Sequence, residues 1–332
     1  MTNQNGLYPL VFHPHYKEKL WGGQKIRTVL QKDFGDLRNC GETWEISGVD
    51  GNISVVAEGP LAGQALTDLI DTYKGKLLGE KVFAKFGTRF PLLVKFIDAN
   101  DDLSIQVHPH DEMAKARHDS FGKTEMWYIM QADEGASLIS GFNQEMDKEK
   151  YQEYFDSGRL TEILNREEAE ANDVFFLPAG RVHTIGKGLL LAEIQQTSDI
   201  TYRIYDFDRV GVDGKKRELH VEQALDAIDY KQYGEYKTSY TAEKDQSTNL
   251  VSCRYFVTNR LDLEEPMNRD YSAIDSFVIY VAVGGKATLN VGDASYHLEM
   301  GQAMLVPAAV DQVEIVPEGQ INLLEAWVPI DE

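Results

Sequence analysis

Residues 103–130, LSIQVHPHDEMAKARHDSFGKTEMWYIM, contain the two segments that decide the fold of this chain. In the first, SIQVH, polar and apolar side chains alternate, which predicts a β-strand with Gln106 and His108 on one face. Side chains two positions apart on a strand lie roughly 6.5–7 Å from each other, close enough to bind one metal ion. The second, TEMWYI, has the composition of another strand and carries Glu125. The stretch therefore predicts two strands that carry three side chains able to bind a metal.

A fourth side chain of this kind ends a third apolar run, FFLPAGRVH, which closes on His183. Two imidazoles, one amide and one carboxylate suit a divalent borderline ion, zinc first. The four residues are Gln106, His108, Glu125 and His183. With one anionic ligand the centre stays positive, which favours Lewis-acid chemistry on a sugar or carbonyl oxygen over a structural role. His108 and His110 are also two positions apart, so His110 could replace Gln106, and the local pattern leaves both pairings open.

Composition narrows the classes of partner. The chain has 332 residues and a formal charge of −21, which argues against nucleic acid and anionic membrane surfaces. A small anionic substrate would need a local pocket of cations. No run of 18 or more apolar residues is present, and the N-terminal segment MTNQNGLYPLVF lacks the pattern of a signal peptide. Because Cys40 and Cys253 are the two cysteines, we expect a cytoplasmic protein without a disulfide framework.

Lys95 lies in the middle of an otherwise apolar run, PLLVKFIDA at residues 91–99, which is typical of a buried strand. A lysine is rarely buried without a partner. Either its side chain reaches solvent at the edge of a sheet, or its ammonium group points into the same cavity as the metal. The sequence leaves both alternatives open.

The rest of the chain indicates two domains. Helical spacing over about 61–86 and the charged segment 143–172 predict helical insertions between strands. The polar stretch YGEYKTSYTAEKDQSTNL is the best boundary, and from residue 250 onward short runs separated by glycines predict a β-sandwich or barrel. We therefore expect one catalytic domain over residues 1–235 and a second domain over residues 240–332.

A twelve-residue pattern occurs twice in the chain. NDVFFLPAGRVH ends at His183 and GQAMLVPAAVDQ ends at Gln312, so that Pro178 corresponds to Pro307. The first copy resembles the second motif of the cupin family, P-x-G-x-x-H. This resemblance implies a mainly β fold with helical insertions and two cupin-like, jelly-roll β-barrels. The C-terminal barrel would lack a metal site, because Gln312 takes the place of the histidine.

Six segments in the first 210 residues resemble the type I mannose-6-phosphate isomerases, in particular their short bacterial class. The segments, in the order found in that family, are KEKLWGG (17–23), ETWEISG (42–48), LSIQVHP (103–109), GKTEMWY (122–128), PAGRVH (178–183) and EIQQTSDITYRIYD (193–206). The resemblance implies an enzyme that interconverts mannose 6-phosphate and fructose 6-phosphate. It would do so through a cis-enediol, by moving a proton between C1 and C2.

The resemblance also assigns residues to the site. The zinc ligands of the family fall on Gln106, His108, Glu125 and His183, which favours Gln106 over His110 and implies one Zn²⁺ per chain. The catalytic arginine of the family falls on Arg203. Further polar positions of the active site fall on Lys95, Lys123 and Glu193.

These residues suggest roles in the reaction. Glu193 is the expected base or proton shuttle, with Lys123 as the alternative. Arg203 would bind an enediolate oxygen or the phosphate, unless it forms an ion pair with Asp199 or Asp206. Cations at Lys95, Lys123 and Arg203 would explain how an acidic protein holds a phosphorylated sugar.

Two alternatives come from other classes of protein. A cupin Fe(II) oxygenase would use a 2-His-1-carboxylate triad of His108, Glu125 and His183, although Glu125 lies 17 residues after His108 rather than a few. A non-catalytic sugar-binding cupin would bind metal and ligand without turnover. The partner we expect is a small phosphorylated sugar, with no nucleic acid and no membrane, and the chain would be a monomer or a homodimer.

Overall fold

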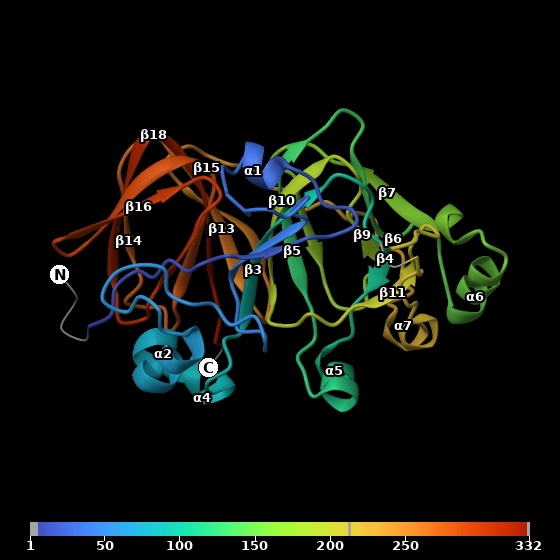
Figure 1. The fold of residues 1–332 in the computed structure, drawn as a ribbon, viewed down its shortest axis with the longest axis horizontal. Helices are drawn as coiled ribbons and strands as arrows, with labels where there is room; N and C mark the ends of the chain where they lie inside the picture. Colours follow the sequence, from blue (N-terminus) through green and yellow to red (C-terminus); the bar gives the residue numbers. More distant parts are fainter. Residues whose placement is uncertain (1–5, 212–213, 331–332) are drawn as a thin grey trace.

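The computed structural model describes residues 6–211 and 214–330 of the chain. The fold is mainly β and consists of three antiparallel sheets joined by loops and short helices. Figure 1 shows the strands of the first 210 residues on one side of the molecule and the strands after residue 246 on the other. The stretch that carries the predicted metal ligands lies wholly in the first part.

The first sheet has six strands in the order β1-β2-β3-β10-β5-β8. Their bounds are β1 His15–Lys17, β2 Glu42–Ile46, β3 Leu92–Ala99, β10 Leu189–Gln196, β5 Glu125–Ala132 and β8 Val174–Leu177. The central strands β3 and β10 are buried along their whole length, which explains their nearly continuous apolar sequence. Because side chains alternate between the two faces of a strand, Lys95 and its cross-strand partner Glu193 point to one face, and Val94 and Ile194 point to the other.

The second sheet has five strands in the order β11-β4-β9-β6-β7. Their bounds are β11 Tyr202–Tyr205, β4 Ile105–Val107, β9 His183–Thr184, β6 Ser137–Phe142 and β7 Leu164–Glu168. The two strands predicted from the opening stretch are thus confirmed as β4 and β5. In this sheet Gln106 stands directly opposite both His183 on β9 and Arg203 on β11, so the register aligns three polar side chains in one row.

The third sheet has seven strands, β12-β13-β18-β15-β16 with β14 paired to β18 and β17 paired to β15. Their bounds are β12 Ser247–Ser252, β13 Val257–Leu263, β14 Met267–Asp270, β15 Val278–Val291, β16 Ala294–Glu299, β17 Ala303–Val306 and β18 Gln312–Trp327. The long pair β15 and β18 shifts register near Gly285. Gly285 has a φ of +71°, and a Cβ there would lie 1.9 Å from the carbonyl oxygen of Gln320, so this irregularity requires glycine.

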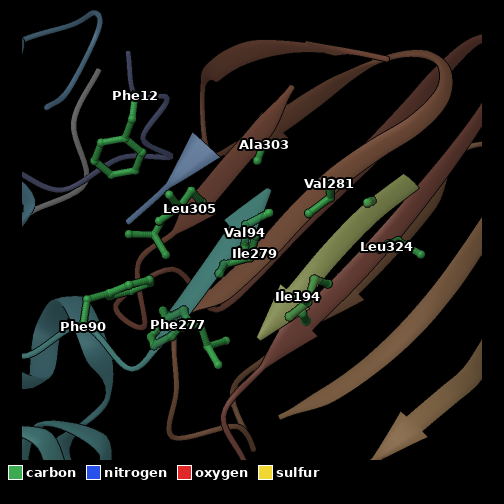
Figure 2. Close-up of a cluster of buried hydrophobic side chains, with 14 of the residues drawn as sticks. Phe12, Phe90, Val94, Ile194, Phe277, Ile279, Val281, Ala303, Leu305 and Leu324 are labelled. Atoms are coloured by element: carbon green, nitrogen blue, oxygen red, sulfur yellow. The ribbon is translucent and has the colours of Figure 1, made fainter. Parts of the chain in front are cut away.

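A shared apolar core joins the two parts of the chain. Figure 2 shows Val94 and Ile194, from the outer face of the first sheet, packed beside Ile279 and Leu324 of the third sheet. Each of these side chains is fully buried. One face of β3 and β10 therefore packs against the third sheet. The other face, which carries Lys95 and Glu193, points into the interior of the first part.

The helices are short and lie mostly at the periphery (Figure 1). Their bounds are α1 Lys25–Thr28, α2 Leu66–Tyr73, α3 Gly75–Leu78, α4 Glu80–Phe86, α5 Asp111–His118, α6 Lys148–Asp156, the 3₁₀ helix Leu160–Glu162 and α7 Val221–Ala227. The segment 61–86 contains three of them. The segment 143–172 is helical at its start but ends in strand β7, because Leu164 and its neighbours pair with β6. Among the helices of the described residues, none is long and apolar enough to cross a membrane.

Candidate metal centre

Three metal-binding side chains meet inside the first part of the chain. His108 directly follows β4, Glu125 begins β5 and His183 begins β9. One ligand atom from each lies within 4.8 Å of the others, and all three side chains are buried. The His183 Nε2 atom is 3.3 Å from Glu125 Oε1, and the His108 Nε2 atom is 3.5 Å from Glu125 Oε2. Both imidazoles therefore present the same nitrogen to one carboxylate.

The opposite nitrogen of each imidazole is held by the backbone. His108 Nδ1 lies 2.9 Å from the carbonyl oxygen of Ile200, and His183 Nδ1 lies 2.8 Å from that of Arg181. Since a carbonyl can only accept, each Nδ1 carries the proton and donates it, which leaves the Nε2 lone pair directed at the centre. Histidine ligands of metals are oriented in this way.

The electrostatics keep both histidines neutral. Burial, followed by the charge of Lys123, lowers the pKa of His108 well below its usual value. Burial also lowers the pKa of His183 to about 4. Neutral imidazole is the form that binds a metal.

Glu125 is the group that most needs a cation. Neither of its buried carboxylate oxygens accepts a well-aligned hydrogen bond, although Lys123 Nζ approaches Oε2 at 3.3 Å. Burial raises the pKa of Glu125 to about 7, with Glu193 adding to the rise and Lys123 and Lys95 opposing it. A buried carboxylate without adequate partners is unfavourable. A divalent cation between Glu125 and the two Nε2 atoms would satisfy it, so these residues fit a bound metal.

Gln106 reaches the centre and His110 does not. The Nε2 atom of Gln106 lies 3.2 Å from Nε2 of His183. The His110 side chain is about half exposed, and its Nδ1 lies 2.8 Å from a carboxylate oxygen of Glu112 on α5. His110 therefore lies away from the other candidate ligands in the structure, because the chain turns away after Pro109 to begin α5.

A cavity of about 430 Å³ opens beside the metal-binding side chains. Gln106 and Lys123 line it, and they are the residues in contact with His183 and His108. Six cationic and three acidic residues line the cavity: Lys17, Lys19, Lys95, Lys123, Arg203 and Arg217 against Glu42, Glu193 and Asp199. This local excess of three positive charges contrasts with the net charge of −21 for the whole chain. The cavity can therefore attract an anionic ligand.

Lys95 points into this cavity, which decides between the two alternatives left open by the sequence. Its Nζ donates to Glu193 Oε1 at 2.8 Å, and Trp127 Nε1 donates to Glu193 Oε2 at 2.8 Å. Burial alone would raise the pKa of Glu193, but Lys95 and Lys123 outweigh it and lower that pKa. Glu193 is therefore an ionised carboxylate in a buried site.

Arg203 lines the cavity without an acidic partner among the described residues. Its Nε lies 3.3 Å from Ser104 Oγ and its NH1 donates to the carbonyl oxygen of Glu218 at 3.0 Å. Asp206 binds Arg209 and Arg217 instead. The ion pair of Arg203 with Asp199 or Asp206 considered above is not formed in the structure.

Sequence reasoning did not single out several residues of the cavity wall. Glu42 on β2 lies 3.1 Å from Lys19 Nζ and accepts from Trp44 Nε1 at 2.7 Å. Burial would raise the pKa of Glu42, but Lys95 and Lys19 lower it to about 2. The signal was present in the sequence, because Glu42 and Trp44 alternate on one face of a strand within a segment already noted for its family resemblance.

Two family models match the chain. The model for the catalytic domain of phosphomannose isomerase type I matches residues 10–136. The model for the cupin domain of mannose-6-phosphate isomerase matches residues 246–325. The first match ends well before the polar stretch YGEYKTSYTAEKDQSTNL, and the second begins within it.

Relatives align over nearly the whole length of the chain. Mannose-6-phosphate isomerase ManA of Bacillus subtilis (strain 168) is 34% identical over 313 residues, which cover 92% of this chain and 95% of the relative. The crystal structure of the mannose 6-phosphate isomerase from Bacillus subtilis superimposes with a TM-score of 0.86 at 32% identity, over 96% of this chain and 99% of that one. A zinc-bound mannose 6-phosphate isomerase shares the fold at a TM-score of 0.79 and 16% identity, over 97% of this chain and 100% of that chain.

Proposed function

The chain belongs to the type I phosphomannose isomerase family, whose members interconvert mannose 6-phosphate and fructose 6-phosphate, and we propose that it performs this reaction in the cavity beside His108, Glu125 and His183. The observation that carries the proposal is the meeting of these three side chains at a cavity with an excess of cations. Such a site combines what the substrate requires, a Lewis acid for the sugar oxygens and positive charge for the phosphate.

One Zn²⁺ is the cofactor that this donor set suits best. His108, Glu125 and His183 would hold it, with the amide of Gln106 as the fourth ligand. When bound, a divalent ion polarises a substrate oxygen and stabilises negative charge on it. The unsatisfied carboxylate of Glu125 and the two backbone-tethered imidazoles support this assignment.

The proton transfer needs a base that is ionised at neutral pH and faces the cavity. Glu193 meets both conditions, because its pKa is lowered and it lines the cavity. It would take the proton from the carbon beside the carbonyl and return it to the neighbouring carbon. Lys95, which donates to Glu193 Oε1, would hold the carboxylate in place. Lys123 is the alternative base, since its Nζ lies on the same wall.

Arg203 would bind the negative charge of the substrate. Its guanidinium lines the cavity and has no acidic partner among the described residues, so its charge is available to a ligand. Guanidinium groups bind phosphate and enediolate oxygens with paired hydrogen bonds. Lys95 and Lys123 add to the positive field at the same wall.

Among the described residues, the two parts of the chain differ in whether they carry candidate metal ligands. We propose two cupin-like β-barrels, over residues 1–235 and 240–332, and no metal site in the second. Gln312, the counterpart of His183, is exposed at the start of β18. The interior of the third sheet holds apolar residues and a buried ion pair between Arg269 and Glu325.

The cellular location and the oligomeric state of the chain are also proposals. We propose a cytoplasmic location, because its substrates are phosphorylated sugars and because Cys40 and Cys253 are both free thiols. We propose that it acts as a monomer or a homodimer. Sedimentation analysis at working concentration would show which.

A coupled assay on mannose 6-phosphate tests the proposed function. We expect fructose 6-phosphate to form, the activity to disappear when the metal is removed by a chelator, and Zn²⁺ to restore it. Oxygen consumption without isomerisation would instead identify an Fe(II) oxygenase, because His108, Glu125 and His183 also have the composition of its triad. Binding of metal and sugar phosphate without any turnover would identify a non-catalytic cupin.

A further inference from the structure

We propose that Asp111, which lies outside the cavity, is a positioning residue for the segment that carries Lys123 and Glu125, and that the C-terminal part of the chain takes part in catalysis by holding Asp111 through Tyr255. This inference rests on the proposed function, because it assigns a task to that same site. Its evidence is a set of hydrogen bonds that connects α5, β5, β10 and the third sheet.

One carboxylate oxygen of Asp111 holds two separate elements. Its Oδ1 accepts from the backbone N–H of Gly122 at 2.9 Å and from the side-chain amide of Gln196 at 2.9 Å. Gly122 directly precedes Lys123, and Gln196 is the last residue of β10. Asp111 therefore connects the segment just before β5 to the end of β10, the strand that carries Glu193.

Gln196 in turn holds Thr124, on the other side of Lys123. Its side-chain oxygen accepts from the backbone N–H of Thr124 at 2.9 Å, and its own N–H donates to the carbonyl oxygen of Thr124 at 3.0 Å. Lys123 thus lies between two backbone groups that are held from outside the cavity. Its Nζ is placed 3.2 Å from His108 Nε2 and 3.3 Å from Glu125 Oε2.

The close approach of Asp111 to this segment depends on glycine. A Cβ at residue 122 would lie 2.8 Å from the backbone nitrogen of Asp111 and 2.9 Å from its Oδ1. Both distances are shorter than an ordinary contact, so any larger residue would push the carboxylate away from the N–H that it accepts. The sequence GKTE therefore combines a glycine for Asp111 with the two charged residues that face the site.

The C-terminal part holds the other oxygen of Asp111. Tyr255, in the turn between β12 and β13, donates its hydroxyl to Oδ2 at 2.8 Å, across 144 residues of sequence. Arg254 lies 3.8 Å from the same oxygen. Asp111 thus accepts three hydrogen bonds, and one of the three donors comes from the third sheet.

This connection matters because catalytic groups tolerate little displacement. When a mutation far from the reacting atoms displaces a catalytic group by about 1 Å, the rate can fall about a hundredfold. Lys123 lies just before β5 and Glu125 is its first residue, so their placement depends on what holds residues 122–124. Asp111 holds one side of that segment directly at Gly122 and the other side through Gln196, which bonds Thr124.

The test compares four variants of the zinc-loaded full-length protein. Asp111→Ala removes the link, Asp111→Asn keeps an acceptor oxygen, and Tyr255→Phe removes only the C-terminal donor. The matched control is Glu112→Ala, which removes the neighbouring carboxylate of the same helical turn; it is 79% exposed and, among the described residues, forms an ion pair with His110 alone. The measurements are kcat, KM and the rate at which zinc is lost to a chelator.

We expect Asp111→Ala to lower kcat by about 10- to 100-fold with KM changed less than about threefold, and to lose zinc faster than the wild type. Asp111→Asn should recover part of the loss, and Tyr255→Phe should lower kcat by about threefold in a variant that stays folded. Glu112→Ala should match the wild type. A wild-type kcat and a wild-type rate of zinc loss in both Asp111→Ala and Tyr255→Phe would overturn the inference.

The outcome is separable from that of the proposed function. If the wild-type protein fails to isomerise mannose 6-phosphate, the proposed function is wrong, and the rate of zinc loss still compares Asp111→Ala with Glu112→Ala. If Asp111→Ala does not fold, Tyr255→Phe decides, since it deletes a single hydroxyl at a partly buried position. An unchanged kcat and zinc loss in that variant would then contradict the role of the C-terminal part.

Discussion

Gln106 and His183 face each other across the β4–β9 pair, with their Nε2 atoms 3.2 Å apart. His183 donates through Nδ1 to the carbonyl oxygen of Arg181, so its Nε2 is an acceptor and the Gln106 amide donates to it. The same amide carries an oxygen that could serve a cation after rotation by half a turn. The strand register thus places a neutral amide beside a neutral imidazole at the candidate metal centre.

The role of Gln106 as fourth ligand can be measured directly. Gln106→Ala should lower the affinity for zinc by about 10- to 100-fold, comparable to losses seen when groups around a metal are removed. His110→Ala is the matched control, because His110 lies at the surface beside the same strand. Equal zinc affinity in wild type and Gln106→Ala, by competition with a fluorescent chelator, would show that Gln106 does not ligate.

Zinc affinity should depend on pH through Glu125. Burial raises the pKa of Glu125 to about 7 in the metal-free protein, whereas His183 has a pKa of about 4. A carboxylate with a raised pKa holds its proton below that pKa, and the proton must leave before a metal can bind. Affinity should therefore rise about tenfold per pH unit from about pH 5 to pH 7 and level off above.

Isothermal titration at several pH values checks this dependence, since about one proton should be released per zinc bound at pH 5 to 6. Glu125→Gln should bind zinc weakly and lose the slope. A zinc affinity that does not change between pH 5 and pH 7 in the wild type would contradict the assigned state of Glu125.

Arg203 should be required for turnover. Arg203→Ala removes the cavity guanidinium that lacks an acidic partner among the described residues, and kcat/KM should fall by about a hundredfold or more. Arg203→Lys should recover little, because an ammonium group lacks the paired donors of a guanidinium. Arg117→Ala, at a surface arginine paired with Asp226, is the control. Near-normal turnover of Arg203→Ala would remove Arg203 from the mechanism.

Glu42 should stabilise the fold in a pH-dependent manner. Its pKa is about 2 in the folded protein against an ordinary 4.5. A lowered pKa contributes stability that is complete above pH 4.5 and is lost as pH falls toward 2. The shift corresponds to about 3 kcal/mol at neutral pH.

Urea unfolding of wild type and Glu42→Gln measures this contribution. The difference between their free energies of unfolding should be about 3 kcal/mol at pH 7 and should shrink below pH 4.5. A difference that stays constant from pH 7 to pH 3 would show that the Glu42 charge is not the cause.

The C-terminal part should depend on its buried ion pair. Glu325 is fully buried, accepts from Arg269 Nε and NH2 at 2.8 Å each, and accepts from Tyr271 at 2.5 Å. Glu325→Gln leaves the arginine without its charge partner and should lower the free energy of unfolding by about 3–5 kcal/mol. Glu318→Gln removes an exposed carboxylate from the same strand and should change little. Equal stability of the two variants would contradict this reading of the pair.

The strands that carry the candidate metal ligands were predictable, because period-two alternation is a local property of the sequence. The sequence also indicated helices near residues 61–86. It did not indicate β7, since residues 164–168 become a strand only through pairing with β6. The sequence also could not predict to which face of the sheet the side chain of Lys95 points. Strand periodicity puts Lys95 on one of two faces, and only the packing of the other face against the third sheet decides which one is the cavity.

Most of the cavity wall could not be derived from local pattern. Glu42 and Lys19 come from an N-terminal segment that reaches the site through the pairing of β1, β2 and β3. Which cations lie near which carboxylates depends on long-range register, and this is why Arg203 could be read either as a free cation or as half of an ion pair. The structure removes that choice by pairing Asp206 with Arg209 and Arg217.

The central claim is that a single divalent ion binds among His108, Glu125 and His183. Anomalous diffraction at the zinc edge, from crystals of the protein purified with zinc, tests it most directly. We expect one strong peak at about 2.0–2.2 Å from the two Nε2 atoms and a Glu125 oxygen. No peak at this position, or a dominant peak elsewhere in the molecule, would contradict the account.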